Sequence, residues 1–218
     1  TVTCVINGGG KLGTLFTQAN ARVETRGFVS DPSVDLPLKD NKWDIEDGVG
    51  NNGVLTVIKN FDEDKSFSSQ VRLNKGDISS DIATYFYESE QLPTVVNLNV
   101  ELNKDGSVSG ARGYIIQLMT GYEEEDLEYV ENLKLATLDK KVDDCILEMF
   151  SDFKRLENTP VKFTCDCSKE KFENGLKSLK KEELQKILEE DKQIEVMCNF
   201  CSEKYLFNED EIKKIIEK

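Results

Sequence analysis

The chain has 218 residues, of which 38% are hydrophobic and 32% are charged, and its 28 basic and 42 acidic residues give a formal net charge of −14. Such an acidic balance argues against undirected electrostatic binding to nucleic acid or to an anionic membrane surface. No apolar run approaches the roughly 20 residues that a membrane-spanning helix requires, so we expect a soluble protein.

Residues 1–121 are predicted to form an α+β core domain. Runs rich in Val, Ile, Thr and Leu (VTCVI, RGFVS, GVLTVIKN and TVVNLNVEL) alternate with Gly, Asn, Asp and Pro clusters that favour turns. NKDGSVSG predicts a hairpin loop, because Asp-Gly supplies the positive φ of a tight turn. One helix is predicted over DISSDIATYFYESEQL, ended by Pro93. The chain starts in mid-strand without an initiator Met, so we expect a segment upstream of Thr1.

Residues 122–160 are predicted to form an acidic helical linker, with 12 acidic and 5 basic residues and therefore a net charge of −7. Apolar residues recur there at steps of three and four, which predicts one apolar stripe on a helix. Two interpretations remain open: a helix packed into the core, or a linker whose stripe rests weakly on its neighbours and can be released. The stripe consists of Leu135, Leu138, Val142, Ile146, Met149, Phe153 and Leu156.

Residues 161–218 are predicted to form a small C-terminal module. KSLKKEELQKILEED predicts a helix, and a final helix is predicted to begin near Asn208, with Glu211 reaching back to cap it. About 58 residues are too few for a stable unaided core, so this module should need a metal or another cross-link.

Two further patterns are interpreted as structural. GGGKLG has the glycine spacing of a dinucleotide-binding loop, but TLFTQANARVETRGFV after it alternates like a β-hairpin, whereas a nucleotide site needs a helix there. The acidic runs at 123–126 and 189–191 lack the alternating ligands and central glycine of an EF-hand loop, and we interpret them as solvated helix faces.

The six cysteines are the most informative residues of a chain that contains no histidine. Four form two close pairs near the C-terminus, while Cys4 and Cys145 stand alone. This distribution fits a reducing compartment with one thiolate metal site rather than a secreted disulfide framework, so we expect a cytoplasmic protein. Cys4 lies in an apolar strand and Cys145 on the apolar side of a predicted helix, and we interpret both as buried, inert thiols.

The paired cysteines predict a four-thiolate zinc site. Cys165 and Cys167 are separated by one residue, 30 residues intervene, and Cys198 and Cys201 are then separated by two. Four thiolates complete the tetrahedral shell of Zn²⁺ and leave no open position for a catalytic water. We therefore predict one Zn²⁺ per chain in the reduced state and no enzymatic activity, although a thiol–disulfide oxidoreductase using Cys198 and Cys201 is a weaker alternative.

The C-x-C pair raises the question of whether the zinc site is purely structural, because a structural four-cysteine zinc site is usually built from two C-x-x-C turns. Metal-bound thiolates are the form that oxidants attack, and partners this close could close into local disulfides and eject the metal. The alternative is a permanent structural zinc site in a module that binds protein or RNA. The negative charge argues against RNA.

Several stretches together resemble the thirty-three-kilodalton heat-shock chaperone family, whose members are redox-regulated holdases. FTCDCSKEKFENGLKSL and IEVMCNFCSEKYLF are similar to the zinc module of that family. INGGGKLG, ETRGFVSDPSVDLPL, VGNNGVLTVIKN, ATYFYESEQLPT and GYIIQLM resemble its core-domain signatures in the same order. The resemblance covers nearly the whole chain.

The resemblance implies that the four cysteines bind zinc in an inactive state. Oxidation would release zinc and pair Cys165 with Cys167 and Cys198 with Cys201, after which the zinc module and the linker at 122–160 lose structure. The active form would bind unfolding client proteins without ATP and would tend to form a homodimer. The net charge of −14, and not the resemblance, leads us to expect no binding to nucleic acid or membrane. We expect the client-binding surface to include Leu135, Leu138, Val142, Ile146, Met149 and Phe153.

Overall fold

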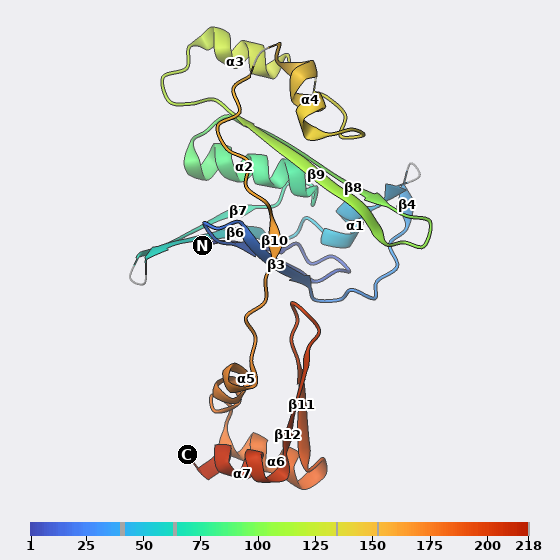
Figure 1. Cartoon of the computed structure of the whole chain (residues 1–218), viewed down its shortest axis with the longest axis vertical. Coiled ribbons are helices and arrows are strands. Elements are labelled where there is room, and N and C mark those ends of the chain that lie inside the picture. Colours follow the sequence, from blue (N-terminus) through green and yellow to red (C-terminus); the bar gives the residue numbers. More distant parts are fainter. Residues whose placement is uncertain (40–41, 63–64, 134, 152, 218) are drawn as a thin grey trace. The chain divides into compact units, whose positions relative to one another are not determined.

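The computed structural model describes residues 1–39, 42–62, 65–133, 135–151 and 153–217 (Figure 1). The chain divides into two compact units. The first comprises Thr1–Val23 and Val29–Pro160, and the second comprises Glu24–Phe28 and Val161–Lys218. A short stretch from the N-terminal half therefore belongs to the same unit as the paired cysteines.

The first unit contains an antiparallel meander in the order β2-β1-β6-β7. Alternating side chains of these strands point to one face, as the sequence pattern predicted. That face carries the buried residues Ile6, Leu55, Val57 and Val71. The strands are β1 (Val2–Asn7), β2 (Thr14–Ala19), β6 (Val54–Asp62) and β7 (Lys65–Arg72).

Helix α2 (Ile78–Glu90) packs on the meander and confirms the helix predicted there. It begins at Asp77, whose carboxylate accepts a hydrogen bond from the Ser80 amide at 3.0 Å, and ends at Gln91 in a left-handed conformation ahead of Pro93. Tyr85 completes the core with the strand residues and with Val49 and Leu73. A short hairpin of β4 (Leu38–Lys39) and β5 (Lys42–Trp43) precedes α1 (Ile45–Val49).

The glycines of GGGKLG serve close backbone packing. A Cβ on Gly8 would lie 2.2 Å from the Gly50 carbonyl oxygen, and one on Gly10 would lie 2.3 Å from that of Gly48. Gly13 has a φ of +70° and is followed directly by strand β2. Because no helix begins after this loop, it lacks the amide-lined phosphate site of a dinucleotide fold. This confirms the structural interpretation of the motif.

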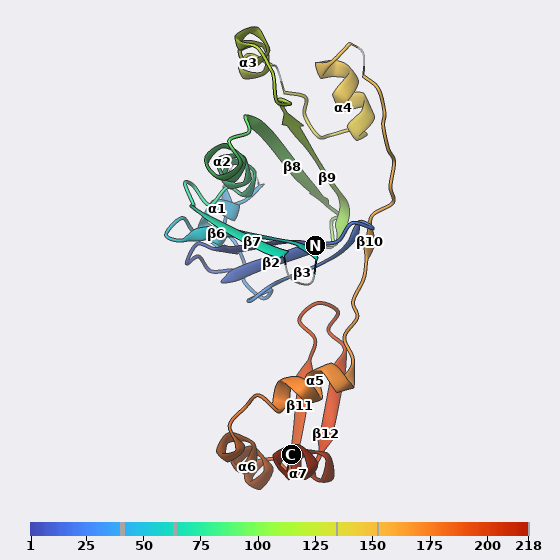
Figure 2. The same ribbon diagram turned by 90° about the vertical axis from the view of Figure 1, so that its left-hand side faces the viewer.

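A long hairpin of β8 (Thr94–Leu102) and β9 (Val108–Gln117) completes the strands of the first unit and confirms the hairpin predicted around NKDGSVSG. Figure 2 shows α2 between this hairpin and the meander. On one face of the hairpin lie two short helices, α3 (Glu124–Glu131) and α4 (Val142–Met149). They contribute to a second buried cluster, which consists of Tyr114, Ala136, Leu138, Cys145 and Met149.

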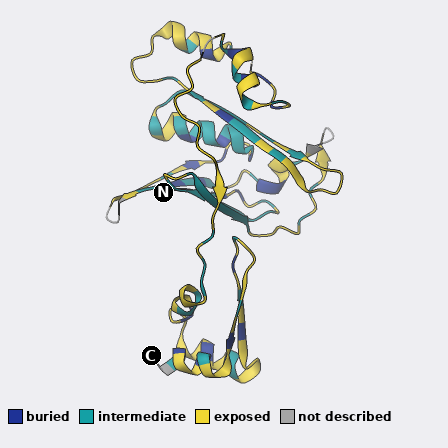
Figure 3. Ribbon diagram, in the orientation of Figure 1, coloured by how far each residue is buried: buried dark blue, intermediate teal, exposed yellow. Residues whose placement is uncertain are grey.

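The prediction of one continuous helix through residues 135–156 is wrong. Residues 135–141 are irregular, and side chains of the hairpin bind two of their carbonyl oxygens. Tyr114 donates to the oxygen of Ala136 at 3.1 Å, and Asn99 donates to that of Leu138 at 3.1 Å. Helix α4 ends at Phe150, and residues 153–160 are extended and exposed, as Figure 3 shows.

The second unit combines two short strands with a compact helical and strand module. β3 (Glu24–Val29) pairs in parallel with β10 (Lys162–Phe163), and β11 (Gln193–Met197) pairs antiparallel with β12 (Lys204–Asn208). Its helices are α5 (Lys169–Leu176), α6 (Lys181–Glu190) and α7 (Glu209–Glu217). The buried cluster consists of Leu176, Leu184, Ile194, Phe207, Ile212 and Ile215.

The predicted cap of the last helix is confirmed. The Asn208 side chain accepts from the Glu211 amide at 3.0 Å, and the Glu211 carboxylate accepts from the Asn208 amide at 3.0 Å. This reciprocal arrangement satisfies two amides that the first turn leaves without helical partners. The molecule as described therefore mixes helices and strands, which confirms the predicted α+β class.

Candidate metal centre

The two cysteine pairs lie in two loops of the second unit. Cys165 and Cys167 follow β10 and precede α5, whose N-cap is Ser168. Cys198 and Cys201 lie in the turn between β11 and β12. That turn is closed by backbone hydrogen bonds from Cys198 to Glu203 at 2.9 Å and from Ser202 back to Cys198 at 2.8 Å.

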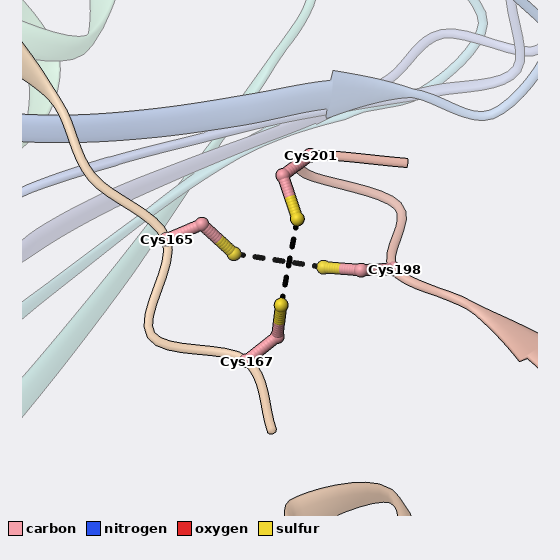
Figure 4. A group of neighbouring side chains, drawn as sticks. All are labelled: Cys165, Cys167, Cys198 and Cys201. Atoms are coloured by element: carbon pink, nitrogen blue, oxygen red, sulfur yellow. Dashed lines mark hydrogen bonds between the residues drawn. The ribbon is translucent and has the colours of Figure 1, made fainter. Parts of the chain in front are cut away.

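The four sulfur atoms converge on one point (Figure 4). They all lie within 4.8 Å of one another. Sγ of Cys165 is 3.6 Å from that of Cys198, and Sγ of Cys167 is 3.4 Å from that of Cys201. A regular tetrahedron with metal–sulfur bonds of about 2.3 Å has sulfur–sulfur edges of about 3.8 Å. The observed cluster fits a metal bound by four thiolates.

The burial of the four thiols differs, although they form one cluster. Cys198 is only 3% exposed, Cys165 and Cys167 are half-buried, and Cys201 is exposed. Burial alone would raise the pKa of Cys198, but the amides of Cys201 and Phe200 and the neighbouring thiols outweigh it and lower the pKa to about 7. Amides directed at a sulfur favour the thiolate, which is the form that binds metal.

Tyr205 also contacts the sulfur cluster, although no motif in the sequence indicated it. Its hydroxyl oxygen lies 3.2 Å from Sγ of Cys167, and its ring packs against Phe172 with a centroid distance of 5.1 Å. The hydrogen bond with Cys167 raises the pKa of the Tyr205 hydroxyl above its usual value. Tyr205 thus links the sulfur cluster to the hydrophobic cluster of the same unit. Only strand alternation after the C-x-x-C turn could have indicated it.

The two isolated cysteines lie in the first unit. Cys145 is fully buried in α4, and its thiol lies 3.2 Å from the carbonyl oxygen of Thr137. Cys4 is half-buried in β1, and burial raises the pKa of its thiol, partly countered by a hydrogen bond with Thr17. The raised pKa of Cys4 disfavours its reactive thiolate, and Cys145 has no exposed surface through which an oxidant could reach it.

The residues expected to bind clients differ in their exposure. Leu138 and Met149 are 4% and 6% exposed, whereas Leu135 and Phe153 are each 41% exposed. Val142 and Ile146 are half-buried on α4. The structure therefore brings only part of the predicted stripe into one buried cluster, and Phe153 lies beyond the end of the helix.

Comparisons with known proteins agree with this geometry. The family model described as "Hsp33 protein" matches residues 1–208. The chain belongs to the Hsp33 family. It is 36% identical to the "33 kDa chaperonin" of Caldanaerobacter subterraneus subsp. tengcongensis, over 100% of this chain and 78% of that protein. It is 37% identical to the "33 kDa chaperonin" of Bacillus subtilis, over 97% and 76% of the two chains.

A solved structure supports the same assignment. The crystal structure of the 33 kDa chaperonin (heat shock protein 33 homolog) from Thermotoga maritima is 31% identical and matches with a TM-score of 0.87, over 99% of this chain and 77% of that one. Membership in this family confirms the predicted resemblance and makes the protein a chaperone. In the part of the chain that the structure describes, no helix has the length and apolar character to span a membrane.

Proposed function

We propose that this Hsp33 family member is a cytoplasmic, redox-regulated holdase that is inactive while Zn²⁺ occupies the four-cysteine cluster. The observation that carries the proposal is the convergence of two loops, one C-x-C and one C-x-x-C, on a single group of four sulfurs. When bound, Zn²⁺ would hold all four sulfurs as thiolates and join the two loops. Such a closed set supports a regulatory or structural metal rather than a hydrolytic one.

The proposed activation is oxidation of the four thiolates by a peroxide. Cys165 forms a disulfide with Cys167, and Cys198 forms one with Cys201. The four sulfurs give up four electrons to two molecules of hydrogen peroxide, which take up four protons and leave as four molecules of water. Disulfide sulfurs no longer offer thiolate ligands, so the site loses its metal. The sulfur contacts of 3.6 and 3.4 Å join Cys165 to Cys198 and Cys167 to Cys201, so forming the proposed disulfides requires the sulfurs of each loop to move toward one another.

Loss of the metal would destabilise the second unit, because its two cysteine loops are joined through the sulfur cluster. The hydrophobic cluster has six buried residues, and Tyr205 connects it to Cys167. A core of this size contributes only a small surplus over the entropy of folding. The second unit is therefore the element whose folding equilibrium the metal controls.

The client-binding surface is proposed to come from residues 122–160. This segment is docked by the cluster around Leu138, Cys145 and Met149 and by side-chain hydrogen bonds from Asn99 and Tyr114. Its chain continues directly into β10 of the second unit, so unfolding there would remove one anchor of the segment. Release would expose Leu138 and Met149 beside the already exposed Leu135 and Phe153. We further propose that the active form is a homodimer.

The proposal is tested by the aggregation of a heat-denatured client protein, measured by light scattering, with reduced and peroxide-treated protein. Oxidised protein should suppress aggregation and reduced protein should not. Peptide mapping by mass spectrometry should find disulfides 165–167 and 198–201, with Cys4 and Cys145 still reduced. Equal protection by both forms would contradict redox control and leave a permanent structural zinc site.

A further inference from the structure

The residues that lie inside the two cysteine motifs are held by one strand from the N-terminal half of the chain. Asp166 is the residue between Cys165 and Cys167, and Phe200 lies between Cys198 and Cys201. The guanidinium of Arg26 donates to the Asp166 carboxylate at 2.6 Å. The same guanidinium lies over the ring of Phe200, 4.7 Å from its centroid. One side chain therefore contacts both metal-binding loops.

A second side chain of β3 reinforces this contact. Phe28 follows Arg26 by two residues, so both side chains point to the same face of the strand. Its ring meets Phe200 edge to face, with centroids 5.4 Å apart and an interplanar angle of 73°. Aromatic pairs in this arrangement contribute stabilisation beyond the area that they bury.

The backbone of β3 also holds the chain that leads into the C-x-C loop. The Thr164 amide donates to the Thr25 carbonyl oxygen at 2.9 Å. The Thr25 hydroxyl in turn donates to the carbonyl oxygen of Lys162 at 3.3 Å. Thr164 directly precedes Cys165. The register of β10 on β3 thus fixes the position of the backbone at Cys165.

We propose that Arg26 and Phe28 are positioning residues for the metal centre: they hold the C-x-C and C-x-x-C loops together and slow the loss of the metal. We name this set of contacts the β3 clamp, and it consists of Arg26, Phe28, Asp166 and Phe200. It deepens the proposed function, on which its regulatory meaning rests, because a clamp that slows metal loss also raises the oxidative challenge needed for activation.

Arginine suits this role better than lysine does. A guanidinium is planar, so it can present its edge to a carboxylate while its face covers an aromatic ring. Arg26 is partly shielded from solvent, with 29% of its side chain exposed, so the contact is less screened than a fully exposed pair. Asp166 also accepts from the ammonium of Lys171 at 2.5 Å, which keeps its carboxylate within the loop.

The test measures zinc transfer from reduced full-length protein to a chromogenic chelator, without oxidant. Arg26→Ala should speed transfer about tenfold, and Arg26→Lys, which keeps the charge but loses the planar stacking, only about threefold. The matched control is Lys177→Ala, which removes a cation of the same unit that pairs with Glu173 away from both loops. It should leave the rate within about twofold of the unchanged protein.

A double-mutant cycle locates the effect in the pair itself. Asp166→Asn alone should also speed transfer, and the double variant should be less accelerated than the product of the two separate increases, because both changes break the same contact between Arg26 and Asp166. Hydrogen exchange supplies a readout beyond metal loss: the Thr164 amide should exchange about tenfold faster in Arg26→Ala, while amides of β11 keep their protection. Retained β11 protection also shows that the variant is folded.

Unchanged transfer and unchanged Thr164 exchange in both Arg26→Ala and Phe28→Leu would overturn the clamp. Fully additive effects of Arg26→Ala and Asp166→Asn would overturn the assignment of their contact. Failure of peroxide to release zinc from the unchanged protein would instead count against the proposed redox function alone, since the chelator and exchange experiments use no oxidant.

Discussion

The core of the first unit and the core of the second are held by different means. In the first, four antiparallel strands and α2 bury a cluster in which Val49 and Leu55 have no exposed surface. In the second, a smaller hydrophobic cluster is joined through Tyr205 to four sulfurs from two loops. The first should be stable by burial alone, whereas the second should depend on a bound metal. The proposed redox switch would therefore lie in the unit that depends on the metal, and its oxidation would leave the fold of the first unit intact.

The largest expected effect comes from removing one sulfur of the cluster, which should unfold the second unit and leave the first unit folded. Cys198→Ser should abolish zinc binding and remove a contribution on the order of 10 kcal/mol from the folding of the second unit. Hydrogen exchange should then show loss of protection in β11 and β12 with unchanged protection in β6. The control is Cys4→Ser, which leaves the cluster intact and should keep one zinc per chain. Persistent protection of β11 in metal-free Cys198→Ser protein would show that the second unit folds without metal.

The converse change should damage the first unit only. Leu55→Ala creates a cavity in a fully buried site and should lower the free energy of unfolding of the first unit by about 2–5 kcal/mol. Urea denaturation followed by the fluorescence of Trp43, the one tryptophan of the chain, measures this loss. Val108→Ala, at an exposed position of the same unit, should change stability by less than about 0.5 kcal/mol. Loss of zinc from Leu55→Ala would argue that the two units do not fold independently.

A third variant tests how firmly α4, in the segment that joins the two units, is docked on the first unit. Met149→Ala should weaken the docking of α4 by about 2 kcal/mol, since this side chain is 6% exposed. Amides of residues 143–150 should exchange faster, and less peroxide should be needed for client protection. Leu147→Ala, on the exposed side of the same helix, is the matched control and should change neither. Equal effects of the two variants would contradict the docked arrangement.

The smallest effect concerns the pH dependence of the first unit. Hydrogen bonds from Lys59, at 2.6 Å, and from Tyr85 lower the pKa of Glu90 below its ordinary value of 4.5. The folded state therefore binds the Glu90 proton less tightly than the unfolded state does. The contribution of Glu90 to the free energy of unfolding is complete above pH 4.5 and is lost as the pH falls through the lowered pKa. Glu90→Gln should remove about 1 kcal/mol of stability at pH 7 and flatten the acid limb of the stability curve. An unchanged acid limb would contradict this assignment.

Local sequence patterns predicted most of the helices and strands, because these elements are set by interactions between residues close together in the chain. Strand alternation, the Asp-Gly turn and the reciprocal cap of Asn208 and Glu211 depend on neighbouring residues, and each is found where it was predicted. The four cysteines that cluster in the structure could be selected from the sequence because two short spacings in a histidine-free chain leave one plausible set of metal ligands.

Contacts between distant residues could not be predicted in the same way. The apolar stripe beyond Leu135 has helical spacing. In the structure, however, Asn99 and Tyr114 of the hairpin donate hydrogen bonds to carbonyl oxygens that a continuous helix would bond to its own amides. Likewise, the position of Arg26 over Phe200 depends on the pairing of β3 with β10, across more than a hundred residues of chain. One sequence contains no direct signal for such pairings.

The most direct test of the account follows zinc release and thiol loss together in reduced protein exposed to hydrogen peroxide at mildly elevated temperature. We expect one zinc to leave as the four thiols of the cluster disappear, while Cys4 and Cys145 remain reduced. Zinc retained with all six thiols intact would contradict the proposed switch and assign the cluster a permanent structural role.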